Sequence, residues 1–169
     1  MKIKQLITLT IVLSVAALAR TAGDARTGYD HRANFAGYKT YSWSTLQTGD
    51  SISDQRVKAA VDAELTERGW NLISFGGDVT VAAMATASDH PTQRYFNDLG
   101  GSRSQGFPYP LQYDYRVQTL AVNLIDAGSG QLIWHGSASA ILSDTPAKNA
   151  VRLAKGVREM FGHFPRTSR

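Results

Sequence analysis

The sequence predicts an α+β fold, a mostly antiparallel sheet of about five strands with two helices packed on one face. Two segments carry apolar residues at the spacing of an amphipathic helix, one in the first half of the chain and one at its end. Between them lie segments of alternating apolar and polar residues, separated by Gly-rich turns. An amphipathic helix must bury its apolar stripe, and a sheet with one apolar face provides the cover.

The first predicted strand, 38–43, is rich in aromatic and β-forming residues. A helix is predicted next, over 53–68. Ser51 followed by Asp54 resembles a capping box, and Gly69 is placed to end the helix. Its apolar stripe has a period of 3.6 residues and consists of Val57, Ala60, Val61 and Leu65.

Two further strands are predicted over 70–75 and 79–86. Gly76, Gly77 and Asp78 lie between them, and this composition is typical of a tight hairpin turn. The pattern therefore indicates a hairpin at this point of the chain.

The clearest hairpin joins strands over 113–125 and 131–142, with a turn that begins at Asp126. In the second strand one face is predicted to lie in the core beneath the C-terminal helix; it carries Leu132, Trp134, Ala138, Ala140 and Leu142. The opposite face, which we expect to meet water or a partner, carries Gln131, His135, Ser137 and Ser139.

The last predicted helix begins with Thr145 as N-cap and Pro146 at the first helical position. It ends at Phe164 and Pro165, and residues 166–169 form a loose tail. Its apolar stripe needs a sheet to cover it; the stripe consists of Ala150, Leu153, Ala154, Val157, Met160, Phe161 and Phe164.

The N-terminus predicts export. Lys2 and Lys4 precede an uncharged run that is too short to span a bilayer, and Ala17-Leu18-Ala19 supplies the small residues of a cleavage site. We therefore expect residues 1–19 to be a signal peptide and 20–165 to form a single domain. No transmembrane helix is expected in the mature chain.

The composition excludes some classes of function. Removal of Lys2 and Lys4 lowers the formal charge of +4 to about +2, and no run of Lys or Arg forms a basic patch. Nucleic-acid binding is therefore not expected. The chain has no Cys, so neither disulfides nor a lipid on an N-terminal Cys are expected.

The chain resembles domain-of-unknown-function family 4136, whose members are bacterial envelope proteins and often lipoproteins. The resemblance rests on the opening 29–43, on DQRVKAAVDAELTERGW at 54–70, on VNLIDAGSGQLIWHGSA at 122–138, and on the closing helix that ends in Phe-Pro. It implies a place in the envelope. It implies no catalytic or ligand residues.

No catalytic, cofactor-binding or metal-binding residues are predicted. The four His lack the i, i+3 or i, i+4 spacing of helical metal ligands. His135 shares a strand face with Ser137 and Ser139, but neighbours two apart on a strand lie about 6.6 Å from one another, beyond hydrogen-bond reach. Asp114, Asp126 and Asp144 suggest a carboxylate pair, although the last two also suit a turn and a helix start.

The segment 87–112 is predicted to be a long irregular loop, because Gly and Pro recur among its aromatic residues. Long loops of this kind are often functional, and aromatic side chains dominate binding hot spots. The candidate interaction surface therefore consists of loop aromatics and polar residues of the exposed strand face: Tyr95, Phe96, Phe107, Tyr109, His135, Ser137 and Ser139.

The leading functional hypothesis is an exported, non-enzymatic interaction module that binds a protein or another component of the cell envelope. One alternative is a small periplasmic hydrolase-like enzyme that uses Asp and His residues brought together by the fold. Another is a carrier of a small apolar ligand between the helices and the sheet. Convergent polar side chains in a cleft would favour the enzyme, an apolar cavity would favour the carrier, and a flat aromatic patch would favour the interaction module.

Overall fold

A computed structural model describes residues 24–94 and 111–165. The predicted signal peptide and the tail 166–169 lie outside these ranges. In chain order the elements are β1 (Asp24–Tyr29), β2 (Thr40–Gln47), α1 (Ser51–Glu67), β3 (Asn71–Leu72), β4 (Val79–Arg94), β5 (Leu111–Asp126), β6 (Leu132–Ile141) and α2 (Pro146–Phe161).

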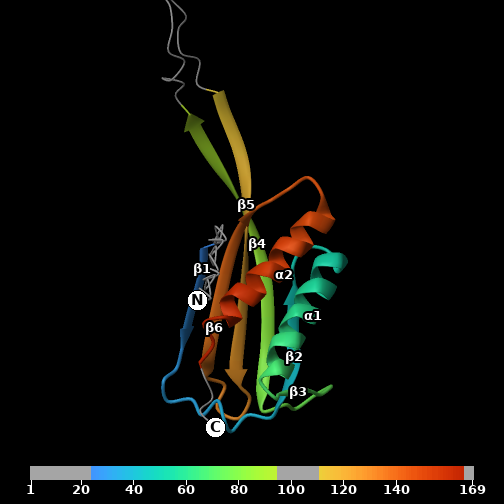
Figure 1. The fold of residues 1–169 in the computed structure, drawn as a ribbon, viewed down its shortest axis with the longest axis vertical. Coiled ribbons are helices and arrows are strands. Elements are labelled where there is room, and N and C mark those ends of the chain that lie inside the picture. The colour runs from blue at the N-terminus through green and yellow to red at the C-terminus, as the bar shows by residue number, and fades with distance from the viewer. Residues whose placement is uncertain (1–23, 95–110, 166–169) are drawn as a thin grey trace, which may run out of the picture.

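The strands form a six-stranded sheet in the order β1-β6-β5-β4-β2-β3, and both helices lie on one face of it (Figure 1). The α+β class and the two helices on one face are therefore confirmed. The sheet differs from the prediction, because it is mixed and has six strands rather than five. β2 runs parallel to both of its neighbours, whereas the other pairs are antiparallel.

β1 is the strand that the sequence did not predict. It contains Gly28 and two charged residues, which are poor strand formers. It nevertheless pairs with β6 over its whole length, from Asp24 opposite Ser139 to Tyr29 opposite Trp134. The strand forms because the edge of β6 offers a ladder of backbone partners, and local propensity does not report such a partner.

The predicted hairpin between 70–75 and 79–86 is wrong. β3 and β4 both pair with β2, on opposite edges, so that β2 lies between them. The connection must therefore cross the β2 backbone near Tyr41. Gly77 lies so close to it that a β-carbon there would be 2.6 Å from the Tyr41 carbonyl carbon. The crossing requires a glycine, and this explains the Gly-rich sequence that suggested a hairpin.

The helix predicted over 53–68 is present as α1, but its cap differs from the prediction. Asp50 is the N-cap, and its side chain accepts hydrogen bonds from the Ile52 and Ser53 amides at 2.9 Å. Asp54 instead accepts from the amide and hydroxyl of Thr48, both at 2.8 Å. The Ser51 capping box is therefore incorrect, because Asp50 satisfies the same orphan amides one residue earlier.

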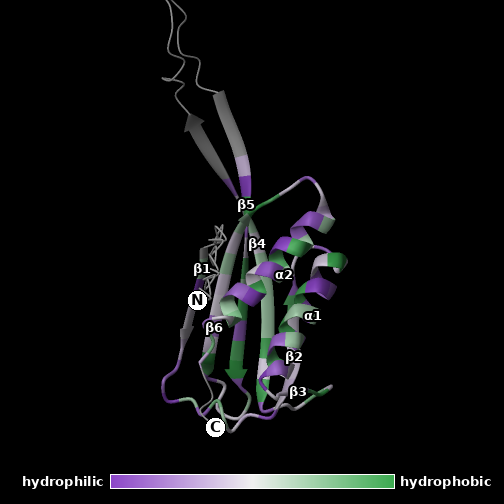
Figure 2. Ribbon diagram, viewed as in Figure 1, coloured by the Kyte–Doolittle hydropathy of each residue, from purple (hydrophilic) through white to green (hydrophobic). Residues whose placement is uncertain are grey.

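The C-terminal helix begins as predicted, with Thr145 at the N-cap position and Pro146 in the first turn of α2, but the Thr145 side chain makes no capping hydrogen bond and α2 ends at Phe161 rather than at the predicted Phe164 and Pro165. Its apolar stripe packs on the sheet, and Leu153, Val157, Met160 and Phe161 are all buried. Figure 2 shows hydrophobic residues on the strands behind the two helices and hydrophilic residues on several helical turns. The space between helices and sheet is thus the main core.

The hairpin of β5 and β6 is confirmed, and Trp134 is fully buried in the core as predicted. Leu132 is not, because a bulge interrupts the alternation. Leu124 pairs with Trp134 whereas Ile125 pairs with Leu132, so Ile133 is the extra residue. Leu132 is therefore turned to the other face, where it is 51% exposed.

The two ends of the segment 87–112 are strands, so the prediction of an irregular loop is wrong for 87–94 and 111–112. β4 continues to Arg94 and β5 begins at Leu111, and the two remain paired up to the Arg94–Leu111 pair. Since β6 ends at Ile141 opposite Val117, the pairs beyond this point form a two-stranded ribbon that extends past the sheet (Figure 1). Within the segment 87–112, residues 95–110 lie outside the described residues.

Candidate functional site

The structure describes three of the seven residues predicted to form the interaction surface. Tyr95, Phe96, Phe107 and Tyr109 lie outside the described residues. His135, Ser137 and Ser139 lie on β6, on the face away from the helices, and all three are half-buried.

These polar residues bind neighbours on β5 rather than each other. His135 Nδ1 lies 2.6 Å from Asn123 Oδ1, and Ser139 Oγ lies 2.9 Å from Thr119 Oγ1. Within the described ranges, no hydrogen bond joins His135 to either serine. A nucleophile must be within hydrogen-bond reach of its base. The arrangement therefore does not assemble a nucleophile and base on this strand.

The face of the sheet opposite the helices is the largest surface that these residues share. On β4, β5 and β6 the buried core positions alternate with positions that point away from the helices. We call these positions of the three strands the open face: Thr80, Ala82, Met84, Thr86, Ser88, Val117, Thr119, Ala121, Asn123, Ile125, Leu132, His135, Ser137, Ser139 and Ile141.

The open face contains no Asp, Glu, Lys or Arg. Typical protein surfaces are about 25–35% charged, so a patch of this size would ordinarily carry about four charged residues. Small residues such as Ala121 and Ser137 occupy its middle, and three apolar side chains are half exposed: Met84 at 50%, Leu132 at 51% and Ile141 at 58%. The face is therefore neutral and partly apolar.

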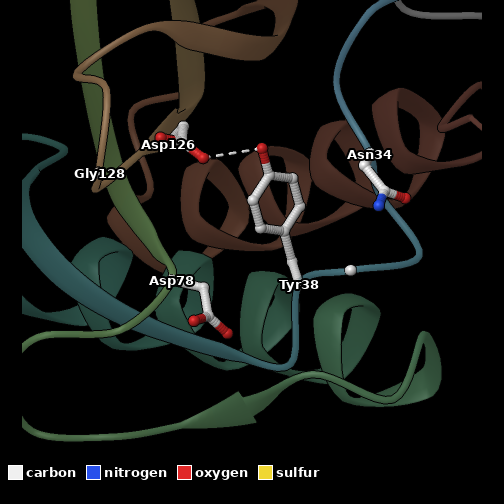
Figure 3. Close-up of a pocket in the computed structure, with 6 residues that line it drawn as sticks. Asn34, Tyr38, Asp78, Asp126 and Gly128 are labelled. Atoms are coloured by element: carbon white, nitrogen blue, oxygen red, sulfur yellow. Dashed lines mark hydrogen bonds between the residues drawn. The ribbon is translucent and has the colours of Figure 1, made fainter.

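A second candidate is a pocket of about 490 Å³ at the end of the sheet where β2 begins and β5 ends (Figure 3). It is lined by Asn34, Gly37, Tyr38, Asp78, Asp126 and Gly128. Figure 3 shows the Tyr38 ring directed toward Asp126, whose Oδ2 accepts a hydrogen bond from the Tyr38 hydroxyl at 2.9 Å.

Both carboxylates of this pocket are bound to the protein itself. Asp126 Oδ1 accepts from the amide and hydroxyl of Ser129, at 2.6 and 2.7 Å, and these bonds form the predicted turn. Asp78 Oδ2 accepts from the Lys39 amide and from the amide and hydroxyl of Thr40, each at 2.9 Å. Asp78 thereby holds the start of β2 against the start of β4.

These hydrogen bonds determine the protonation of the pocket. Bonds from Ser129 hold the pKa of Asp126 below its ordinary value, and the Lys39 amide and Thr40 do the same for the pKa of Asp78. Burial, the bond to Asp126 and nearby carboxylates raise the pKa of Tyr38 to about 12. At neutral pH both carboxyls are ionised and Tyr38 is neutral, so neither Asp donates a proton as a general acid would. The pocket is best explained as a structural junction.

Sequence reasoning identified Asp126 as a turn residue and overlooked Asp78. The signal for Asp78 was its place after Gly76-Gly77, but local sequence does not show that β2 lies beside it. Of the other two candidate acids, Asp114 lies on β5 and Asp144 directly before α2. Asp114 and Asp126 lie toward opposite ends of β5, and Asp144 precedes the N-cap of α2, so the sequence separation along the strand keeps the first two apart.

The remaining site classes gain no support from the described residues. The layer between helices and sheet is filled by large side chains, including Trp134 and Phe161 with ring centroids 4.7 Å apart. Across 24–94 and 111–165, no group of three or more acidic or His residues could hold a metal ion. Neither α1 nor α2 has the length and apolar content of a membrane-spanning helix.

The fold is similar to two solved structures. One is a PDZ domain protein from Parabacteroides distasonis, with 17% identity, a TM-score of 0.58, and coverage of 87% of this chain and 36% of that one. This chain thus spans little more than a third of that protein. The other is the PelC dodecamer from Paraburkholderia phytofirmans, with 12% identity, a TM-score of 0.50, and coverage of 82% and 94%. Identities this low establish likeness of fold alone.

A comparison with curated proteins finds no significant match. The family comparison is decisive, because one family model matches residues 25–166 and so includes every strand and helix except the first residue of β1. This match agrees with the resemblance seen in the sequence. The chain belongs to the family described as Domain of unknown function (DUF4136).

Proposed function

We propose that this protein is an exported, non-enzymatic interaction module of the bacterial cell envelope, and that it binds its partner through the open face. Export is supported by Lys2, Lys4 and the apolar run that follows them. The partner is an envelope protein or another envelope component. The four aromatic residues of the predicted loop remain a prediction of the sequence.

The observation that carries this proposal is the absence of charge from the open face. Binding surfaces are distinguished less by bulk hydrophobicity than by depletion of charged residues at their centre. Exposed apolar patches often mark interaction sites, whereas charged residues interspersed over a surface oppose association with other chains. A neutral face with exposed Met84, Leu132 and Ile141 lacks this protection. We infer that a binding partner covers the open face when the protein functions in the cell.

The two alternatives have less support. A hydrolase would need a base in contact with a nucleophile, whereas His135 binds Asn123 and the carboxylates of the pocket bind backbone amides. A carrier would need an apolar cavity, whereas Trp134 and Phe161 pack against each other between helices and sheet. The neutral surface with exposed Met84, Leu132 and Ile141 supports the interaction module, although it is not the aromatic patch that the sequence predicted.

Site-specific photo-crosslinking in bacterial cells tests the proposal. A photoreactive amino acid is placed at Ser137 on the open face, or at Ala63 on the exposed surface of α1 as a control. We expect covalent adducts of defined mass from position 137 and none from 63. Equal crosslinking from both positions, or none from 137, would show that the open face is not a binding surface.

Export is tested separately by cell fractionation and N-terminal sequencing of the protein recovered from the envelope. We expect a new N-terminus near Arg20. A protein that keeps Met1 and remains in the cytoplasm would contradict the envelope role, whatever the crosslinking result.

A further inference from the structure

The geometry of the open face points to a second copy of this chain as its occupant. We propose that two copies pack sheet against sheet through their open faces, around a two-fold axis parallel to β5. This inference rests on the proposed function, because it names the partner for the same surface.

One row of residues across the sheet shows how the face is organised. Register pairs join Arg26 on β1 to Ser137, Ser137 to Ala121, Ala121 to Met84, and Met84 to Gln47 on β2. Ala121 is therefore the centre of the row, and the one charged residue is at its end. A neutral centre within a polar rim is the usual anatomy of a protein interface.

The row is also complementary to itself. Rotation about an axis along β5 places Met84 of one copy opposite Ser137 of the second copy, so that a large side chain meets a small one. The same rotation places Arg26 opposite Gln47 of the second copy. A perpendicular axis in the plane would instead oppose two Met84 and two Arg26 side chains. The axis along β5 therefore avoids both crowding and like-charge contact.

The charge of the open face permits self-association. Two identical faces carry identical charges, so self-association is penalised wherever charged residues lie near the axis. The open face has none, and its only ionisable side chain is His135, which faces Asn123. From β1 across the row, Arg26 lies at the rim, and no other charged side chain belongs to the row.

The area is sufficient for a stable dimer. The open face is three strands wide and about 27 Å long, and the shorter flanking strands β1 and β2, which carry Arg26 and Gln47, widen it to five strands spaced about 4.8 Å apart, for a surface of roughly 600 Å². Two such surfaces bury roughly 1,200 Å², at the lower end of the range of about 1,200–2,000 Å² for specific interfaces. Because the central residues are small, the sheets can approach to the usual separation of about 10 Å.

Sedimentation velocity of the full chain, expressed with its own leader and purified as the host processes it, tests the inference. We expect a concentration-dependent dimer. Ala121→Glu and Ala121→Lys place like charges on the axis, so each alone should raise the dimer dissociation constant at least tenfold. Mixing the two variants should restore the dimer, because Glu then faces Lys. Ala63→Glu on α1 is the matched control and should leave the dimer unchanged.

A gentler variant covers the case in which a charge at position 121 prevents folding. The chain has no Cys, so Ala121→Cys introduces a single thiol at the centre of the face. A short homobifunctional maleimide should link two copies of this variant and should not link Ala63→Cys. Circular dichroism and thermal unfolding verify that each variant is folded.

A chain that stays monomeric at all concentrations, or a dimer that Ala121→Glu and Ala121→Lys leave intact, would overturn the inference. Failure of the dimer proposal can be distinguished from failure of the proposed function. Adducts between position 137 and a different protein, together with a monomeric purified chain, would retain the interaction module and reject the second copy. No adducts from 137 and no dimer would reject both.

Discussion

The indole ring of Trp134 lies directly over Gly136, two residues along the same face of β6. A β-carbon at Gly136 would overlap this ring and would also lie 2.8 Å from the Met160 sulfur on α2. Gly136→Ala should therefore destabilise the protein by about 1–3 kcal/mol, as overpacking of a filled core does. Gly28→Ala, where an added β-carbon meets nothing within 4 Å, is the matched glycine control in denaturant unfolding.

Trp134 itself should be among the most sensitive positions in the chain. It is fully buried and packs against Phe161 and Phe164 with ring centroids 4.7 and 5.6 Å away. Trp134→Ala should cost roughly 3–5 kcal/mol of unfolding free energy. Its Nε1 atom is buried without a hydrogen-bond partner among the described residues, so Trp134→Phe leaves no orphan group and should cost less. Equal losses for the two variants would contradict this account.

Arg68 links the C-terminal end of α1 to the C-terminal end of α2 through a hydrogen bond and ring contacts. Its Nη2 donates to the Phe161 carbonyl at 2.8 Å, and the guanidinium lies 5.2 and 5.1 Å from the ring centroids of Phe161 and Phe164. Arg68→Met keeps an apolar stem but removes the donors, and should cost about 1.5–3 kcal/mol. The same substitution at exposed Arg56 should be nearly neutral. Urea unfolding of both variants measures the difference.

The helices and the β5–β6 hairpin could be predicted because their signals are local. The stripe from Val57 to Leu65, the Thr145-Pro146 start and the turn at Asp126 depend on neighbours within a few residues. Burial of Trp134 followed from its place between those elements. Leu132 was assigned to the wrong face of β6, because the bulge at Ile133 reverses the alternation of core-facing and solvent-facing side chains. No neighbouring residue in the sequence signals this bulge.

The remaining differences concern which segments meet. β1 exists because β6 offers it an edge, and β3 and β4 are separated because both pair with β2. Gly77 is required by contact with Tyr41, distant in sequence, so its role could not be distinguished from that of a turn glycine. The open face was only partly foreseen, through His135, Ser137 and Ser139. Its neutrality emerges when β4, β5 and β6 are placed side by side.

Asp78 should contribute stability that is lost in acid. The Lys39 amide and Thr40 lower the pKa of this carboxyl in the folded protein below its ordinary 3.8. The unfolded chain therefore binds the proton more readily, and the contribution is complete above pH 3.8 and falls away below it. Asp78→Asn should flatten the acid limb of a stability profile measured by urea unfolding. Asp144→Asn, at an exposed position, controls for loss of charge; an unchanged limb in Asp78→Asn would contradict the assignment.

Tyr38 should contribute stability that is lost at alkaline pH. Burial and the bond to Asp126 raise its folded pKa to about 12 from an ordinary 10.0. The folded state therefore holds the phenol proton more tightly, and this stability is present below pH 10 and is lost as the pH rises through about 12. Tyr38→Phe should lose about 0.5–1.5 kcal/mol at neutral pH and show a flatter alkaline limb. Tyr29→Phe, at a 41% exposed position, is the control.

The two-stranded ribbon should be dispensable for folding. Among the side chains that the structure describes, the buried residues of β4 and β5 extend no further toward the ribbon than Ala83 and Leu120. An isolated pair of strands is at best marginally stable in water, and shortening a connection changes closure entropy only slowly. The sheet therefore orders the ribbon, and the ribbon should contribute little to the stability of the protein.

A variant in which Asn-Gly replaces residues 90–115 tests this relationship. In this variant Asn-Gly connects Asp89 to Arg116, two residues that are paired across the ribbon with side chains 3.1 Å apart. Asn-Gly is a favoured two-residue hairpin turn. The unfolding free energy should stay within about 1 kcal/mol of the parent, because all the buried residues that the structure describes lie outside the removed segment. Thermal and urea unfolding measure it. A shortened protein that fails to fold would show that the ribbon, or the segment it carries, belongs to the core.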